Sequence, residues 1–259
     1  MKKILFIYFI IAFQGTAIAQ TTRNFTVILR SDAGTHKLWD ETVVDIWGFS
    51  STLSGQPTLP GKILYANEGD TIKIRAWNVS QNHHHTIHLH GLDVDTQNDG
   101  DPMTSFSLGH MEDTIYTFIA EHAGTYIYHC HVGDVVHVQM GMYGLIIINA
   151  KDGKNEAWTN GPAYSKDYAW LMTELDKSWH DTVPEHDHQT GLIVLPPYQP
   201  DYFLINGKSK QQLNDSSISV AGAVGEKIYL RLSNIGFFNN TVIFPASLKA
   251  EIITSDGRP

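Results

Sequence analysis

The sequence predicts an all-β protein whose antiparallel strands form a sandwich or barrel, arranged as two similar domains in tandem. Short runs of alternating apolar and β-branched residues recur along the chain, with Gly, Asn, Asp and Pro between them. No long stretch has the 3.6-residue period of a helix. In addition, the segment GDTIKIRAWN at 69–78 returns as GEKIYLRLSN at 225–234, and such self-similarity indicates a repeated domain.

The N-terminal 19 residues predict a signal peptide. Lys2 and Lys3 precede the apolar run 4–13, and Ala17 and Ala19 form the small-residue pattern of a cleavage site. The apolar run is shorter than the roughly 20 residues that span a bilayer. We therefore expect an exported protein, periplasmic or secreted, with no membrane span after cleavage. A retained membrane anchor is the alternative.

Composition argues against a nucleic-acid partner and draws attention to the single cysteine. The net charge of -9 and the absence of a basic patch argue against nucleic-acid binding. The chain has 14 His but only 1 Cys, so an exported form cannot close an internal disulfide. An isolated Cys is usually an inert core residue. Cys130, however, stands directly between two histidines.

The first domain is expected over residues 23–150, and two of its segments carry metal-binding side chains. They are HHHTIHLHG at 83–91 and GTYIYHCHVGDVVHVQMGMYG at 124–144. The strands we expect around them are 25–29, 63–65, 71–77, 114–119, 126–128 and 143–148.

The pleat of a strand predicts which histidines lie on the same face and can bind the same metal site. Residues two apart lie on the same face, so His88 and His90 project together, as His129 and His131 do. Cys130 points to the opposite face, and one strand can therefore serve two metal sites. A blue copper site takes two His, one Cys and a weak axial Met. Cys130 is the only thiolate, and the remaining candidates are His85, His137 and the two methionines that follow, Met140 and Met142.

These motifs together resemble the multicopper oxidases. The pattern HxxHxHG is followed by HCH, a further His, and a Met five residues later. The fragment HVQMGMYG is also similar to copper nitrite reductases. The resemblance implies cupredoxin-like Greek-key sandwich domains and selects Met142 over Met140 as the axial ligand. It assigns a type 1 copper to His85, Cys130, His137 and Met142. It also assigns the type 2 copper to His88 and the type 3 pair to His90, His129 and His131.

The resemblance implies a function without catalytic residues beyond the metal ligands. The type 1 copper would take electrons from a reducing substrate and pass them along His-Cys-His to a trinuclear cluster that reduces dioxygen to water. A nitrite reductase is one alternative, although that family has Asp in place of His88 and no His directly after the Cys. A blue-copper electron carrier is another, but it would leave four imidazoles unexplained. The reducing substrate is not readable from the sequence.

The second half of the chain is expected to be a linker followed by an incomplete domain. Residues 151–197 are the expected linker, with a further strand offered at 168–175. Residues 198–259 would begin a second cupredoxin-like domain, and we expect the chain to be a fragment, because such a sandwich needs about 100 residues. This domain has lost the copper ligands, since the positions equivalent to His85, His88 and His90 hold Thr241, Phe244 and Ala246.

That loss leaves the trinuclear cluster half supplied. In the resembled family the cluster uses eight histidines in four HxH pairs, and this chain offers two pairs. The others would come from another domain or subunit, as in relatives that form trimers. The remaining candidates are given ordinary roles, as solvated, hydrogen-bonded or packing side chains: His36, His83, His84, His110, His122, His180, His186, His188, Met103, Met111 and Met140.

Overall fold

The computed structural model describes residues 21–185 and 194–257. The predicted signal peptide, residues 1–19, and the pair His186 and His188 lie outside these ranges. No helix within the described residues is long and apolar enough to cross a membrane.

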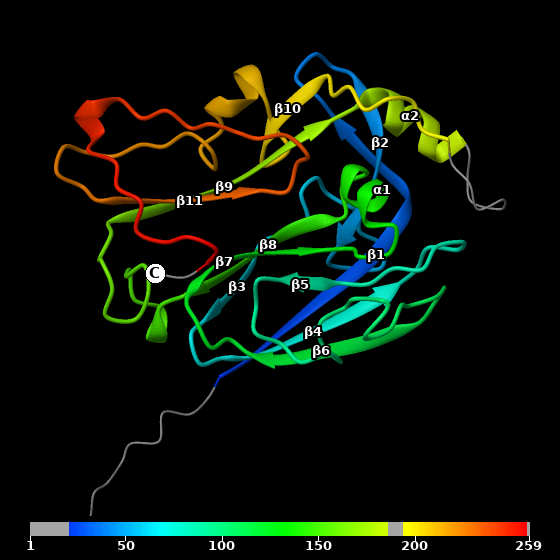
Figure 1. Cartoon of the computed structure of the whole chain (residues 1–259), viewed down its shortest axis with the longest axis horizontal. Helices are drawn as coiled ribbons and strands as arrows, with labels where there is room; N and C mark the ends of the chain where they lie inside the picture. Colours follow the sequence, from blue (N-terminus) through cyan, green and yellow to red (C-terminus); the bar gives the residue numbers. More distant parts are fainter. Residues whose placement is uncertain (1–20, 186–193, 258–259) are drawn as a thin grey trace, which may run out of the picture.

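The first domain consists of two four-stranded sheets (Figure 1). In the first, β1 is antiparallel to β2 and parallel to β4, and β4 is antiparallel to β6. In the second, β8 is parallel to β3 and antiparallel to β7, which is antiparallel to β5. The first sheet contains β2 (Val43–Ser50), β1 (Thr22–Lys37), β4 (Thr71–Asn78) and β6 (Asp113–Ile119). The second contains β3 (Leu64–Asn67), β8 (Tyr143–Asn149), β7 (Gly124–His129) and β5 (His88–His90).

The alternation along each strand places the core between these two sheets. In β4, Ile72, Ile74 and Ala76 are buried, whereas Lys73 and Arg75 between them are exposed. The buried side chains of both sheets form one cluster, which also contains Cys130, Met140 and Met142. The candidate type 1 site therefore adjoins this core.

Strand β8 is buried on both faces because it contacts two cores. Ile146 and Ile148 belong to the core of the first domain, whereas Tyr143 and Leu145 pack in a second cluster. That second cluster includes Leu171, Leu175 and Leu204 from the C-terminal part of the chain. Burial on both faces explains why this strand is a nearly continuous apolar run.

The C-terminal part contains one three-stranded sheet that repeats the pairing of the first domain. Strand β9 is antiparallel to β10 and parallel to β11, just as β1 pairs with β2 and β4. Gly69 and Gly225 precede the repeated strands with nearly the same positive φ, 90° and 91°. The internal repeat is therefore also a structural one. The sheet contains β10 (Tyr202–Ile205), β9 (Lys166–Leu175) and β11 (Ile228–Asn234).

Helical segments are few and short. A helix α1 (Asp134–Gln139) lies between Cys130 and β8, and α2 (Lys177–Glu185) follows β9. Three 3-10 turns complete the described elements: η1 (Lys151–Gly153), η2 (Lys210–Asn214) and η3 (Ala246–Leu248).

The all-β class is confirmed, with two differences of detail. The sheets are mixed rather than purely antiparallel, because β1–β4, β3–β8 and β9–β11 are parallel pairs. Strand β2 and the helices α1 and α2 were not expected from the sequence. Strand β9 covers the further strand offered at 168–175 within the linker, and its buried side chains pack in the second core.

Candidate metal centre

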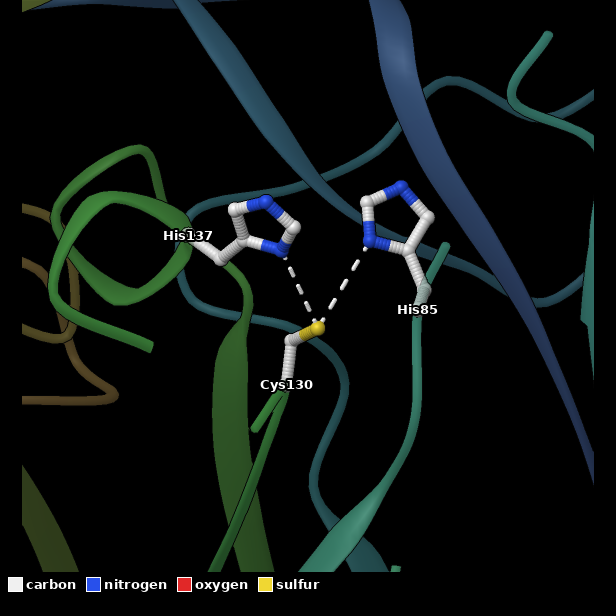
Figure 2. Close-up of side chains that lie close together, drawn as sticks. All are labelled: His85, Cys130 and His137. Carbon is white, nitrogen blue, oxygen red and sulfur yellow. Dashed lines mark hydrogen bonds between the residues drawn. The ribbon is translucent and has the colours of Figure 1, made fainter. Parts of the chain in front are cut away.

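The structure brings three of the predicted type 1 ligands together from three separate segments. The Cys130 Sγ lies 3.6 Å from His85 Nδ1 and 3.2 Å from His137 Nδ1, and all three side chains are buried (Figure 2). His85 precedes β5, Cys130 follows β7, and His137 lies on α1. Both imidazoles turn the same ring nitrogen towards the sulfur, as ligands of one shared ion would.

A buried serine fixes the ring of His85. The Ser80 Oγ lies 3.0 Å from His85 Nε2, accepts a hydrogen bond from the Ser31 amide, and donates to the Leu29 carbonyl. Because the hydroxyl proton is used on Leu29, Nε2 of His85 is the donor. The proton then stays on Nε2, and the Nδ1 lone pair faces Cys130. Such outer hydrogen bonds are typical of metal-bound histidines.

The loop from Cys130 to Met142 folds back on itself, and main-chain hydrogen bonds hold its candidate ligands close to one another. The amide of Cys130 donates to Met142 O (3.0 Å), and the amide of Met142 donates to His137 O (3.0 Å). Met142 therefore adjoins both other ligands of the loop, and its side chain is fully buried. The other methionine, Met140, is tied to β2, where the amide of Trp47 donates to its carbonyl.

The electrostatics of the site favour neutral groups until a cation binds. Burial raises the pKa of the Cys130 thiol to about 11. Burial also holds the pKa of His85 well below its ordinary value, and the neighbouring imidazoles, His137 first, lower it further. Imidazole lone pairs are therefore available, whereas a thiolate here needs a bound cation to stabilise it. Two nitrogens, a thiolate and a nearby thioether fit copper by ligand softness.

The four other predicted ligands form a second group on the other side of Cys130. Ligand nitrogens of His88, His90 and His129 all lie within 4.8 Å of one another. The ring of His131 lies 4.9 Å from that of His88 and 5.7 Å from that of His129. The structure therefore gathers both HxH pairs.

Hydrogen bonds prepare two of these rings for metal binding. Nδ1 of His88 lies 2.7 Å from the Asp99 carbonyl, and Nδ1 of His129 lies 2.9 Å from the Cys130 carbonyl. Each Nδ1–H donates, so each Nε2 keeps its lone pair. Burial lowers the pKa of His129 to about 4, which also keeps its ring neutral near neutral pH.

A cavity of about 200 Å³ opens beside the second group. His90 and His129 line it together with Asp134 from α1, and Asn234 and Phe237 contribute from the C-terminal part of the chain. His90 is exposed, in contrast to the buried ligands around Cys130. A small molecule can therefore reach this group more readily than the candidate type 1 site.

Several residues around the sites were not foreseen from the sequence. Ser80 and Asp99 orient ligands through the hydrogen bonds described above, and Trp47 packs edge-on against His137, with ring centroids 5.1 Å apart. His83, taken as an ordinary loop residue, packs on Trp47 at 4.7 Å. Their roles depend on long-range contacts, which no local motif signals.

The other histidines and methionines differ in their surroundings. His36, His110 and His180 each contact main-chain carbonyls. His122 forms an exposed group with Asp93 and Glu121. Met140 lies in the core, whereas Met103 and Met111 are exposed.

The comparisons with known proteins agree with this geometry. Residues 50–153 match the model of the multicopper oxidase family. Copper resistance protein A of Escherichia coli is 34% identical over 170 residues, 64% of this chain and 25% of that protein. A copper-containing nitrite reductase of Neisseria gonorrhoeae is 26% identical over 216 residues, 78% of this chain and 47% of that protein. The matches thus span only a quarter to a half of these relatives.

A solved structure shares the fold. A blue copper oxidase from Nitrosomonas europaea superimposes with a TM-score of 0.65 at 27% identity, covering 83% of this chain and 61% of that one. The predicted cupredoxin-like fold is therefore confirmed. Copper is the cofactor of the matched family, and the donor set around Cys130 fits it.

Proposed function

We propose that this chain, whose residues 50–153 match the multicopper oxidase family, is a copper-dependent oxidoreductase that moves electrons from a reducing substrate to dioxygen. The observation that carries the proposal is the position of Cys130 between two groups of histidines. Copper bound by these groups supplies one-electron redox chemistry. The protein supplies the ligands, their orientation and the exclusion of water.

The chain joins the two ligand groups by a short covalent path. His129 and His131 are the neighbours of Cys130 in the sequence, and the Nδ1–H of His129 donates to the Cys130 carbonyl. An electron that arrives at the buried group therefore has only one residue of main chain to cross. The exposed position of His90 and the adjoining cavity suit the second group for a small oxidant such as dioxygen.

The second group is half of the cluster that the family resemblance implies. Within the described residues, the C-terminal sheet and its loops contribute no histidine to a metal-binding group. We propose that another subunit or domain supplies the missing imidazoles, with a trimer as one arrangement. The exposure of His90 supports this, because a partner's ligands could approach from that side.

Nitrite reduction is the second candidate function, and one observation favours it. A type 2 copper of that family needs three histidines, and His88, His90 and His129 meet this number within one chain. The nitrite reductase match also covers more of the chain than the copper resistance protein match. His131 argues for the oxidase, because a mononuclear site has no use for a fourth imidazole.

Two assays on the copper-loaded full chain separate these functions. We expect oxygen uptake with a phenol as donor and no nitrite consumption under anoxia. His131→Ala should abolish oxygen uptake, whereas the control His84→Ala, at an exposed histidine outside both groups, should retain it. Nitrite turnover that survives His131→Ala would favour the reductase. A blue protein with neither activity would be an electron carrier.

We also propose that the protein is exported after cleavage of residues 1–19. The charged, apolar and small-residue regions of this segment support export. Mass spectrometry of protein recovered from the periplasm or medium should find Gln20 at the N-terminus. An intact Met1 on cell-associated protein would contradict this.

A further inference from the structure

The candidate type 1 ligands are almost entirely closed off from solvent, so an electron donor can touch at most a narrow edge of His137. His85, Cys130 and Met142 have no exposed surface, and His137 is only 7% exposed. A residue that packs against these ligands and is more exposed than His137 therefore offers an outside donor a larger contact surface.

Two aromatic side chains cover the imidazoles of His85 and His137. The ring of His83 is stacked 5.8 Å from that of His85 and lies edge-on, 6.0 Å, to that of His137. Trp47 lies 5.1 Å from His137 and 4.7 Å from His83. Trp47 is only 3% exposed, whereas His83 is half-buried, so His83 is the ring of this pair that reaches solvent.

We propose that His83 is the electron-entry residue of this protein: an aromatic reductant stacks on its ring and transfers an electron through it to the ligands His85 and His137. This inference rests on the proposed function. A phenol that reacts there loses one electron, which reduces Cu(II) to Cu(I), and one proton, which passes to water, and it departs as a phenoxyl radical. Trp47 packs against the His83 ring at a tilt of 53°, and its amide donates to the Met140 carbonyl in the loop from Cys130 to Met142.

The surroundings of His83 favour a neutral or cationic aromatic donor. The carboxylate of Asp32 interacts electrostatically with His83. The His83 ring offers an aromatic surface for an aromatic donor, and aromatic pairs prefer stacked or edge-on contacts. Asp32 also disfavours an anionic donor at the same place.

A second route to the site exists and has weaker contacts. Exposed His110 contacts the Ser80 carbonyl through Nδ1 at 3.1 Å, and the Ser80 hydroxyl contacts His85 Nε2. This route crosses two hydrogen bonds and the saturated atoms of Ser80. The ring of His83, by contrast, packs directly against both imidazoles.

Anaerobic stopped-flow reduction by hydroquinone tests the proposal, with loss of the blue absorption of copper-loaded protein as the signal. His83→Leu keeps the ligands covered but removes the ring, and should lower the second-order rate constant roughly two- to tenfold, the value of one aromatic contact. His83→Phe should restore it. The matched control His84→Leu, at the neighbouring exposed histidine, should react like the unchanged protein.

The reduction potential and the EPR spectrum must stay unchanged in these variants. A slower reduction then reflects the loss of an electron-entry residue and not a change in the copper site itself. An unchanged rate in His83→Leu would overturn the proposal, and so would a fall confined to His110→Leu. If no blue absorption forms at all, it is the proposed function that fails. In copper-free protein, phenol should shift the NMR signals of His83 and Trp47 but not those of His84; the absence of such shifts would also contradict the proposal.

Discussion

Burial and metal binding shift the pKa of the Cys130 thiol in opposite directions. Burial raises its pKa to about 11, so the metal-free side chain is a neutral thiol. A bound copper ion favours the thiolate, and binding therefore releases a proton. The two imidazoles, whose lone pairs face the sulfur, need no such deprotonation near neutral pH.

Ser80 offers a test of how the outer hydrogen bonds prepare the site. Ser80→Ala removes the acceptor for His85 Nε2–H, and we expect copper affinity to fall roughly 10- to 100-fold. The matched control is Ser107→Ala, because the Ser107 hydroxyl contacts the ring of His84, which is not a predicted ligand. Competition with a copper chelator measures both affinities, and equal losses in the two variants would contradict the assignment.

The lowered pKa of His129 predicts how the copper-free fold responds to acid. Its folded value of about 4 lies below the ordinary 6.5, so the unfolded chain binds more protons between these pH values. The contribution of His129 to stability is therefore complete above pH 6.5 and is lost as the pH falls towards 4. Thermal unfolding across this range should show the loss, and His129→Gln should reduce it. An equal pH dependence in the variant would contradict the prediction.

At the scale of elements, helix α1 sets the geometry of the loop from Cys130 to Met142, which carries three of the candidate ligands. Gly133 precedes it with φ 53°, and the amide of His137 donates to the Gly133 carbonyl. A side chain at that φ is disfavoured by about 1–2 kcal/mol. Gly133→Ala should therefore lower the free energy of unfolding by about that amount and shift the blue absorption band. Gly109→Ala is the control, because Gly109 does not have a positive φ and a Cβ there would meet only ordinary contacts.

The repeated strands supply a matched pair of arginines. Arg231 on β11 is buried, pairs with Asp167 at 3.0 Å, and donates to Thr125 of the first domain at 3.1 Å. Arg75, at the same place in β4, forms an exposed pair with Asp113. Arg231→Met should cost on the order of 2 kcal/mol of unfolding free energy, whereas Arg75→Met should cost less than about 1 kcal/mol. Chemical denaturation measures both, and similar costs would mean that Arg231 does not tie the domains together.

The sequence could predict the features that depend on local pattern. Alternation located β4 and β6, a run of apolar and β-branched residues located β8, and the HCH motif located the candidate ligands on both sides of Cys130. It could not predict the features that depend on distant partners. Helix α1 has only six residues, too few for a clear period, and β2 is buried over most of its length. Ser80, Trp47 and His83 acquire their places only when separate segments pack together.

At the scale of the whole molecule, the copper content should follow the state of association. One chain contains the four residues that we assign to the type 1 site and four of the eight cluster histidines that the family resemblance implies. We expect fewer than four copper ions per chain in a monomer and about four in an oligomer that completes the cluster. Size-exclusion chromatography with copper analysis of each peak measures this, and a monomer with four copper ions would contradict the proposed sharing.

The most direct test of the central claim is the absorption and EPR spectrum of the copper-loaded protein beside that of Cys130→Ser. The account predicts an intense blue absorption and a type 1 EPR signal that need the thiolate of Cys130 together with His85, His137 and Met142. Cys130→Ser should remove both, while a matched substitution outside the ligand sets, Ser107→Ala, leaves them in place. A Cys130→Ser protein that stays blue would contradict the assignment of this site.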